Sequence, residues 1–335
     1  MKSKASEPKE MTTGRALFGF LVPILVLIAL IIAGADVAIA ALAAVFVMVI
    51  YGAYMGFSWE SMEKAMGSGI TSIATATVIM MLVGSMVASW MASGAIPTML
   101  YYGLQIINPK LFLPICFILP AFMSLAAGTS WGAISTIGVV LCGMAGGLGI
   151  PVAMAAGAVI SGAFFGDKMS PLSDTTLLAA ASSEVPVFEH ITSMFYTTVP
   201  TTLIALVLYT ILGLNASGSI DTVAVGELMN GLSSNFNINV FNLLPVILVL
   251  LLSVKKVPAF ITFGVGIGSG ILWSMIVQGY SFMDNINFIM NGFSIESGVD
   301  AVNTLVNRGG FTSMLSLVGI LLVCGILSGL FTEMK

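Results

Sequence analysis

The stretch of sequence best suited to ion chemistry is a polar segment enclosed by long apolar runs. It reads GDKMSPLSDTT from Gly166 to Thr176. Pro171 has no backbone N–H, so it interrupts a helix and frees carbonyl oxygens. Carboxyl and hydroxyl groups around it supply hard oxygen ligands of the kind that a desolvated sodium ion needs. These side chains belong to Asp167, Ser170, Ser173, Asp174, Thr175 and Thr176.

Asp167 and Asp174 predict the chemistry of an antiporter. Desolvation penalises the charged form of a carboxyl group at membrane depth, so near neutral pH such a group holds either a proton or a cation, but not comfortably both. Competition of that kind couples the movement of one ion to the other. The alternative is an interfacial loop in which Asp167 and Lys168 simply pair with each other or snorkel to the membrane surface.

A second polar break, Gly128 to Gly132, reads GTSWG and has three interpretations. As GxxxG it is a notch for helix packing. As GxSxG it would make Ser130 a hydrolase nucleophile, but that motif needs a strand, a turn, a helix and an Asp–His pair, and His190 is the only histidine. As a helix break it exposes carbonyls beside the Thr129 and Ser130 hydroxyls, which would face the Asp174 segment. We favour this third interpretation, because it completes a cation shell.

Glu184, Glu189 and His190 cluster at the end of the polar segment. A histidine titrates near physiological pH, so Glu184 and His190 are candidates for a proton relay to the ion site. A solvated loop edge is the more common role for such residues.

The elements that position these motifs must cross a membrane. Hydrophobic residues make up 58% of the 335 positions and charged residues 8%, against about 25% charged in soluble domains. Residues 65–109, 111–166 and 191–220 contain no acidic or basic side chain, and one crossing needs only about 20 apolar residues. The sequence therefore predicts an all-α polytopic membrane protein.

The expected spans and breaks follow from these runs. Spans lie near 17–34, 37–57, 70–92, 191–214, 241–254, 257–278 and 311–332. A half-polar helix over 58–64 is expected to link the second and third spans. Glycines and prolines at 128–132 and 146–151 predict discontinuous helices, and the cations of residues 1–15 place the N-terminus in the cytoplasm.

The second series of apolar runs looks like a repeat of the first. Residues 21–26 match 243–248, and residues 56–61 match 292–297 at five of six positions. In the same order, Gly69 and Gly84 align with Gly310 and Gly325.

Charge placement relates the two series. The first span is followed only by Asp36, whereas its counterpart is followed by Lys255 and Lys256, so the repeats should be inverted. The fold expected is that of an inverted-repeat secondary transporter with discontinuous helices and an incomplete second repeat. Its parts are a cytoplasmic tail (1–15), a first repeat with broken helices (16–214), a polar linker (215–240) and a partial second inverted repeat (241–335).

Two other classes of partner are not indicated. Cys116, Cys142 and Cys324 lie in apolar runs without CxxC spacing, so neither a disulfide framework nor a zinc site is expected. The net charge of -4 and the lack of a basic patch indicate no nucleic-acid partner.

The GTSWG motif and the segment from Gly166 to Thr176 together resemble the NhaC family of bacterial sodium/proton antiporters. The resemblance extends through Val306 to Phe311. It implies a plasma-membrane exchanger of the ion-transporter superfamily, a carrier rather than an enzyme, which moves Na+ outward against protons without a cofactor. Its partners would be the lipid bilayer, Na+ and protons. Some members instead couple malate entry to sodium and lactate exit, and Lys168 is the one candidate anion site within a motif.

The resemblance also implies which residues form the ion path. Carried over position by position, these are Thr129, Ser130, Asp167, Ser170, Ser173, Asp174 and Thr175. Family members continue past the equivalent of Lys335, so a further expectation is a non-transporting fragment of a split carrier, completed by a second polypeptide. Sodium/proton antiport, organic acid exchange and the fragment remain the three alternatives.

Overall fold

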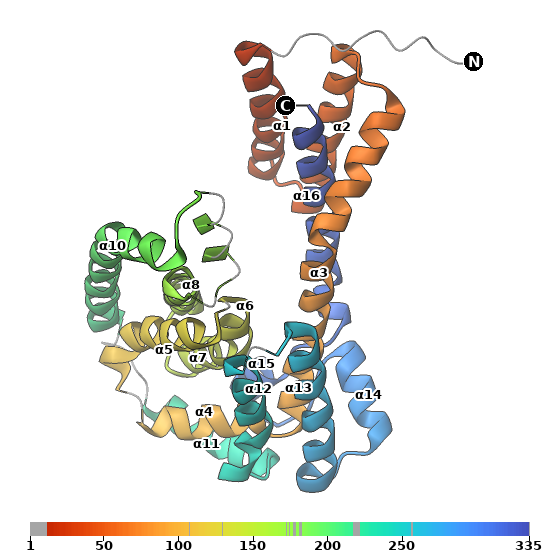
Figure 1. Cartoon of the computed structure of the whole chain (residues 1–335). Coiled ribbons are helices and arrows are strands. Elements are labelled where there is room, and N and C mark those ends of the chain that lie inside the picture. The colour runs from red at the N-terminus through yellow and green to blue at the C-terminus, as the bar shows by residue number, and fades with distance from the viewer. Residues whose placement is uncertain are drawn as a thin grey trace. The chain divides into compact units, whose positions relative to one another are not determined.

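The computed structural model describes most of the chain. The described residues are 12–106, 108–128, 130–171, 173, 175–176, 179–180, 183–216, 222–255 and 257–334. Two predicted ion ligands, Thr129 and Asp174, lie outside them. The chain divides into two compact units, Met1–Met81 with Thr312–Lys335, and Leu82–Phe311 (Figure 1).

The prediction of a polytopic helical membrane protein is confirmed. Within the described residues, seven helices are long and apolar enough to cross a membrane, or eight if one bent pair counts as a span. The seven are Thr13–Ile32, Val37–Met55, Trp59–Ala92, Val152–Met169, Val187–Asn215, Ala259–Gln278 and Thr312–Glu333.

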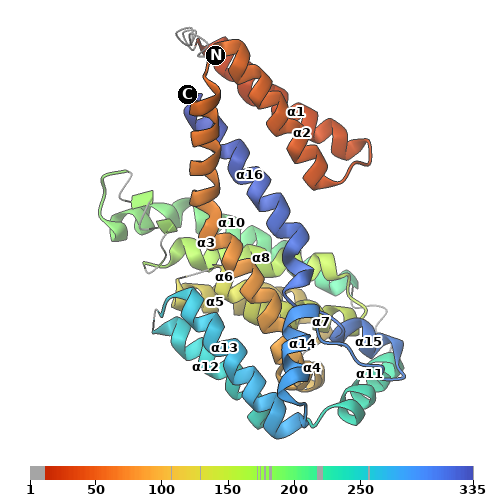
Figure 2. The same cartoon turned by 90° about the vertical axis from the view of Figure 1, so that its right-hand side faces the viewer.

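The unit that contains both chain ends is built on three helices and part of a fourth. These are α1 (Thr13–Ile32), α2 (Val37–Met55), α16 (Leu315–Glu333) and the part of α3 (Trp59–Ala92) that ends at Met81. Helices α1 and α2 lie side by side (Figures 1 and 2). Methionine and leucine side chains, including Met48, Met55 and Leu330, form a buried core between α2 and α16. Asp36 begins α2 by accepting a hydrogen bond from the Ala38 N–H at 2.8 Å.

The expected short helix over 58–64 is wrong as a separate element. It is the first part of α3, which continues without a break for 34 residues. Nothing between Trp59 and Met66 breaks a helix, since the segment contains neither glycine nor proline. At about 1.5 Å per residue, α3 is longer than the roughly 30 Å hydrocarbon core, so its charged first turns can extend beyond the bilayer.

The second unit contains the remaining helices. In chain order they are α4 (Ala95–Ile106), α5 (Phe112–Ala127), α6 (Ser130–Ala133), α7 (Val139–Gly147), α8 (Val152–Met169), α10 (Val187–Ala216), α11 (Thr222–Asn235), α12 (Leu244–Val254), α13 (Ala259–Trp273), α14 (Phe282–Asn291) and α15 (Asp300–Val306). A π-helical turn, Ile134–Gly138, joins α6 to α7. The predicted breaks are confirmed, because α5 ends before Gly128 and α7 ends before Gly149, whose φ is 68°.

The polar stretch 215–240, expected as a linker, contains helix α11. Leu228 and Leu232 lie one turn apart and are almost completely buried. The side chain of Leu228 packs beside Gly147, where a larger residue would collide with it. The helix was not predicted because the stretch is mostly polar. Its packing depends on only two buried leucines, which the overall composition does not reveal.

Helix α14 begins with a reciprocal cap. The Asp284 N–H donates to the Ser281 hydroxyl at 3.1 Å, and the Ser281 N–H donates to the Asp284 carboxylate at 2.9 Å. The Ser281 hydroxyl, which donates to the Asp284 carboxylate at 2.7 Å, and the Ser281 N–H hold the pKa of Asp284 below its ordinary value. A lowered folded-state pKa means that the stabilisation is fully present above the ordinary pKa, about 4, and is lost as the pH falls through the folded value.

Ser281→Ala is expected to weaken the start of α14 by about 1 kcal/mol, the usual cost of losing an N-cap side chain. Hydrogen exchange of the α14 amides, corrected for the intrinsic rate, measures the effect. Protection should fall about fivefold in the variant, and in the unchanged chain it should fall only at acidic pH. Ser294→Ala removes an exposed serine outside any helix and should leave this protection unaltered.

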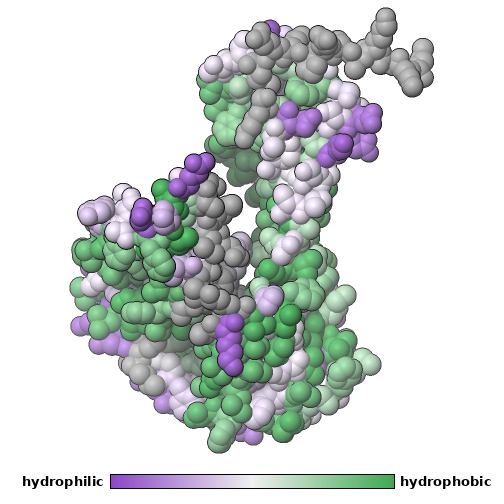
Figure 3. All heavy atoms as spheres, viewed as in Figure 1, coloured by the Kyte–Doolittle hydropathy of each residue, from purple (hydrophilic) through white to green (hydrophobic). Residues whose placement is uncertain are grey.

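The outer surface of the second unit is apolar over much of the face seen in Figure 3. Large hydrophobic side chains on α10 are exposed, among them Leu203, Ile204, Val207 and Leu208. In water such a surface would be unfavourable, whereas lipid chains can cover it. The surface therefore agrees with the assignment of spans.

Candidate ion-binding site

The site is built on the close approach of α8 to α5. Gly162 and Gly166 are four residues apart, so they lie on one face of α8. A methyl group on Gly162 would overlap the carbonyl oxygen of Phe117, and one on Gly166 would overlap that of Ala121. This backbone-to-backbone packing puts the last turn of α8 beside the end of α5.

The end of α5 is set by Gly128. Its φ of 70° lies in the left-handed region, and its N–H donates to the Ser124 carbonyl at 2.7 Å. Glycine adopts this conformation without the steric penalty that other residues pay. Helix α6 then begins at Ser130, whose side chain is 4% exposed. The short polar motif thus turns the chain and returns a hydroxyl toward α8.

The carboxylate of Asp167 lies at the centre of the described site and is only 6% exposed. Its Oδ2 atom is 3.4 Å from the Ser130 hydroxyl and 3.3 Å from the Thr175 hydroxyl. The Thr175 hydroxyl is also 2.9 Å from that of Ser173. Both contacts to the carboxylate are longer than an ordinary O–H···O hydrogen bond, about 2.7–2.8 Å. Four predicted site residues therefore lie together, and the hydrogen bonds to the Asp167 carboxylate are weak. The four are Ser130, Asp167, Ser173 and Thr175.

Other hydroxyls in the segment tie it to helix ends. The Ser170 hydroxyl donates to the Leu125 carbonyl of α5 at 2.8 Å. The Thr176 hydroxyl donates to the carbonyls of Asp167 and Lys168, at 3.2 and 3.1 Å. Ser170 was predicted as an ion ligand, but in this arrangement its hydroxyl joins α8 to α5. The C-terminal ends of two helices, which carry partial negative charge, meet beside Asp167 and favour a cation there.

Ser124 is a site neighbour that the sequence reasoning missed. It is fully buried, and its hydroxyl has no hydrogen-bond partner among the described residues. Its Cβ atom lies next to Gly166, directly before Asp167. Ser124 stands in an apolar run rather than in a polar motif, which is why it was overlooked. The signal was that it is the only hydroxyl-bearing residue of α5.

Asp167 and Lys168 do not pair with each other. Asp167 is buried, whereas Lys168 is exposed, and the described residues form no ion pair with either. The part of the alternative in which the two residues pair is therefore wrong, whereas snorkelling by Lys168 is not tested. Neighbouring positions on α8 project about 100° apart, so the two side chains serve different surroundings.

The candidate relay residues lie apart from the described contacts of Asp167. Glu184 is exposed and has a φ of 54°, and His190 is partly buried in the first turn of α10. No described hydrogen bond connects either residue with Asp167, so the relay stays a prediction. The part of the chain that the structure covers also holds no group of three or more His, Cys, Asp or Glu side chains that could bind a metal. The described oxygens of the site are thus one carboxylate, hydroxyls and backbone carbonyls.

Apolar spans, a broken helix pair and a buried carboxylate among hydroxyls are features of a polytopic membrane transporter. The model of the Na+/H+ antiporter family matches residues 8–177 and 162–335. The chain belongs to this family, as its motifs predicted.

Curated relatives carry antiporter names. The malate-2H+/Na+-lactate antiporter of Bacillus subtilis is 39% identical over 282 residues, covering 84% of this chain and 60% of the relative. The Na+/H+ antiporter NhaC of Alkalihalophilus pseudofirmus is 38% identical over 285 residues, with coverages of 84% and 61%. The arginine/ornithine antiporter of Halobacterium salinarum is 34% identical over 286 residues, with coverages of 82% and 59%. The chain thus spans about 60% of the length of these relatives. No solved structure matches it.

Proposed function

We propose that this chain forms the ion-exchanging part of a carrier that moves Na+ against protons across the bacterial plasma membrane, with its N-terminal tail in the cytoplasm. The observation that carries the proposal is the buried Asp167 carboxylate, enclosed by hydroxyls at the meeting point of two helix ends. In this proposal the chain is a carrier and not an enzyme, and Na+ and H+ are its substrates.

The spacing of the site oxygens supports a cation. Hard cations of calcium's size bind oxygens at about 2.3–2.6 Å, so two ligands at right angles lie about 3.3–3.7 Å apart. The Asp167 carboxylate is separated from the Ser130 and Thr175 hydroxyls by 3.4 and 3.3 Å. These separations are too long for strong hydrogen bonds but suit oxygens that share an ion. Thr129, Ser173 and Asp174 complete the proposed ligand set.

The exchange of Na+ for a proton follows from the single negative charge of the Asp167 carboxylate. A buried carboxylate without a nearby cation is costly, so it takes up either Na+ or a proton. Binding of one species then displaces the other, and no cofactor is required. Glu184 and His190 are the proposed route by which the proton reaches the site.

Glycine contacts support the proposed inverted repeat. Within the first unit, Gly69 of α3 packs against the Gly325 carbonyl of α16. Within the second, the Gly310 N–H donates to the Gly84 carbonyl of α3 at 2.7 Å. In the repeat alignment, Gly69 corresponds to Gly310 and Gly84 to Gly325. Each contact is therefore the counterpart of the other, a reciprocity that two-fold-related elements produce.

Reconstitution in lipid vesicles tests the proposal. A pulse of NaCl is expected to drive protons across the membrane, reported by a trapped pH dye, while choline chloride drives none. Lactate and malate, added separately, test the alternative of organic acid exchange, which the name of one relative raises. Stimulation by either acid would favour that alternative, and indifference would leave plain antiport.

A binding measurement separates a fragment from a wrong assignment. Radioactive Na+ should bind the purified chain and be displaced as the pH falls. Binding without flux would favour the non-transporting fragment that a second polypeptide completes. Absence of both binding and flux would contradict the proposed function.

A further inference from the structure

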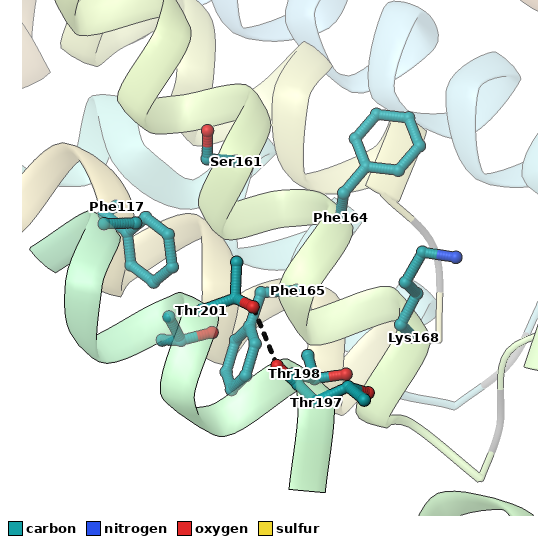
Figure 4. A pocket seen from close by; sticks show the side chains of 10 residues that line it. Phe117, Ser161, Phe164, Phe165, Lys168, Thr197, Thr198 and Thr201 are labelled. Atoms are coloured by element: carbon teal, nitrogen blue, oxygen red, sulfur yellow. Dashed lines mark hydrogen bonds between the residues drawn. The ribbon is translucent and has the colours of Figure 1, made fainter. Parts of the chain in front are cut away.

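A cavity of about 340 Å³ lies between α8 and α10, beside the ion site but on the Lys168 side of α8 (Figure 4). Its walls include one cation, several threonines and three phenylalanines, and no acidic residue. The volume is within the range of about 300–1,000 Å³ typical of small-molecule sites. Neither the ion-exchange chemistry nor the packing of α8 on α5 uses this space.

One end of the cavity is cationic. Lys168 lies in the last turn of α8. Its side chain and Thr198 lie at one end of the cavity, and Phe117 lies at the opposite end (Figure 4). Its ammonium group forms no ion pair with the described residues. Lys168 is exposed, so its ammonium group lies at the open end of the cavity, where it can pair with an anionic group on whatever enters.

Two hydroxyls at the cavity wall are available to a ligand. Thr198 and Thr202 are one turn apart on α10, and neither hydroxyl forms a hydrogen bond within the described part of the chain. The neighbouring hydroxyl of Thr201, by contrast, donates to the Thr197 carbonyl at 2.7 Å. The Ser161 hydroxyl is also satisfied, by the Gly157 carbonyl at 2.7 Å and the Tyr209 hydroxyl at 2.9 Å. The Lys168 ammonium group and the Thr198 and Thr202 hydroxyls can therefore all donate hydrogen bonds to a carboxylate.

The remaining wall is apolar. The rings of Phe117 and Phe165 lie 6.0 Å apart between centroids and are inclined by 37°. A ligand with a short hydrocarbon or aromatic body would cover these rings, whereas a small, wholly polar acid would leave them in contact with water.

We propose that this cavity binds a small amphipathic monocarboxylate. Its carboxylate pairs with Lys168 and accepts from the Thr198 and Thr202 hydroxyls, and its apolar body lies on Phe117 and Phe165. The proposal is independent of sodium/proton antiport, because binding is measured without any ion flux. An anionic phospholipid is the competing occupant that the experiment must separate.

Phenylacetate is a suitable probe, and phenylacetamide is its neutral counterpart of the same shape. Calorimetric titration of the purified full chain in uncharged detergent is expected to show that the acid binds at least about tenfold more tightly than the amide. Lys168→Gln should weaken phenylacetate binding about tenfold, while Lys168→Arg keeps the charge and most of the affinity. The double change Thr198→Val and Thr202→Val should weaken it several-fold.

Thr210→Val is the matched control. Thr210 lies on the same helix outside the cavity, and its hydroxyl is bonded to the Leu206 carbonyl at 2.7 Å, so its loss should not alter binding. Equal affinity for acid and amide would overturn the proposal, as would unchanged binding in Lys168→Gln. It would equally be overturned if phosphatidylglycerol protected Lys168 from an amine-reactive reagent and phenylacetate did not, since the cavity would then be a lipid site.

Discussion

Asp167→Asn should reduce Na+-dependent proton flux at least about 100-fold. The amide has nearly the same shape and can still contact the Ser130 and Thr175 hydroxyls, but it carries no charge and does not exchange a proton in this pH range. Removing one member of a buried charge pair typically costs about 3–5 kcal/mol, or more than 100-fold in binding. The measurement is the initial rate of proton movement after a NaCl pulse in vesicles, together with binding of radioactive Na+.

Two further variants make this result specific. Asp300→Asn makes the same chemical change at an exposed position in the first turn of α15 and should leave the flux intact. Asp167→Glu keeps the charge on a longer side chain and should retain part of the Na+ binding. Wild-type flux in Asp167→Asn, with the variant inserted at the normal level, would remove this residue from the proposed exchange.

Gly166→Ala is the second change with a large expected effect. The added methyl group would overlap the backbone carbonyl of Ala121, which cannot move aside like a flexible side chain. Helix α8 must then separate from α5, and overpacking of this kind costs about 1–3 kcal/mol. Separation also moves Asp167 away from the end of α5, so the flux should fall at least about tenfold along with the thermal stability of the purified chain.

Gly157→Ala is the matched control for the helix contact. Gly157 is also in α8, but a methyl group there meets only the Tyr209 hydroxyl, at the ordinary distance of 3.6 Å. Because alanine favours a helix over glycine by about 0.5–1 kcal/mol, this variant should be as stable as the unchanged chain or more so. If Gly166→Ala behaved like Gly157→Ala in both flux and stability, the close approach of α8 and α5 would not be what positions the site.

Much of the architecture could be predicted because lipid allows few alternatives. Uncharged runs determined six of the seven described spans, and glycine or proline determined the breaks at Gly128 and Gly149. The predicted span 241–254 is wrong as a separate crossing, because α12 has only 11 residues. Val152–Met169, expected as a short piece of a broken helix, is long enough to cross. The errors arose where local composition was a poor guide to helix formation. The charged start of α3 continues a helix because no residue there stops it, and α11 forms in a polar stretch because Leu228 and Leu232 dock it. Such docking depends on distant parts of the chain.

The candidate site divides in a similar way. The polar motifs at the two helix breaks predicted that Ser130, Thr175 and Asp167 lie close together. The reason is that the oxygens of two facing breaks can surround one cation. What could not be predicted is the direction of each hydroxyl. Ser170 donates to a carbonyl of α5, and Ser124 reaches the site from an apolar helix, because the glycine face of α8 fixes the distance between the two helices. Sequence spacing gives no measure of that distance.

The π-helical turn between α6 and α7 has a consequence for how this region can change over evolution. Such a turn holds one residue more than an α-helical turn, so the side chains before it are shifted by about 100° in helical phase relative to those after it. Ser130 lies before the turn, and Gly143, which packs against Leu100, lies after it. Removing the extra residue would rotate the ion-facing Ser130 hydroxyl by about 100° relative to the face of α7 that packs on α4. Homologous sequences that keep the contact between Ser130 and Asp167 should therefore keep the number of residues between Ser130 and Gly143 constant.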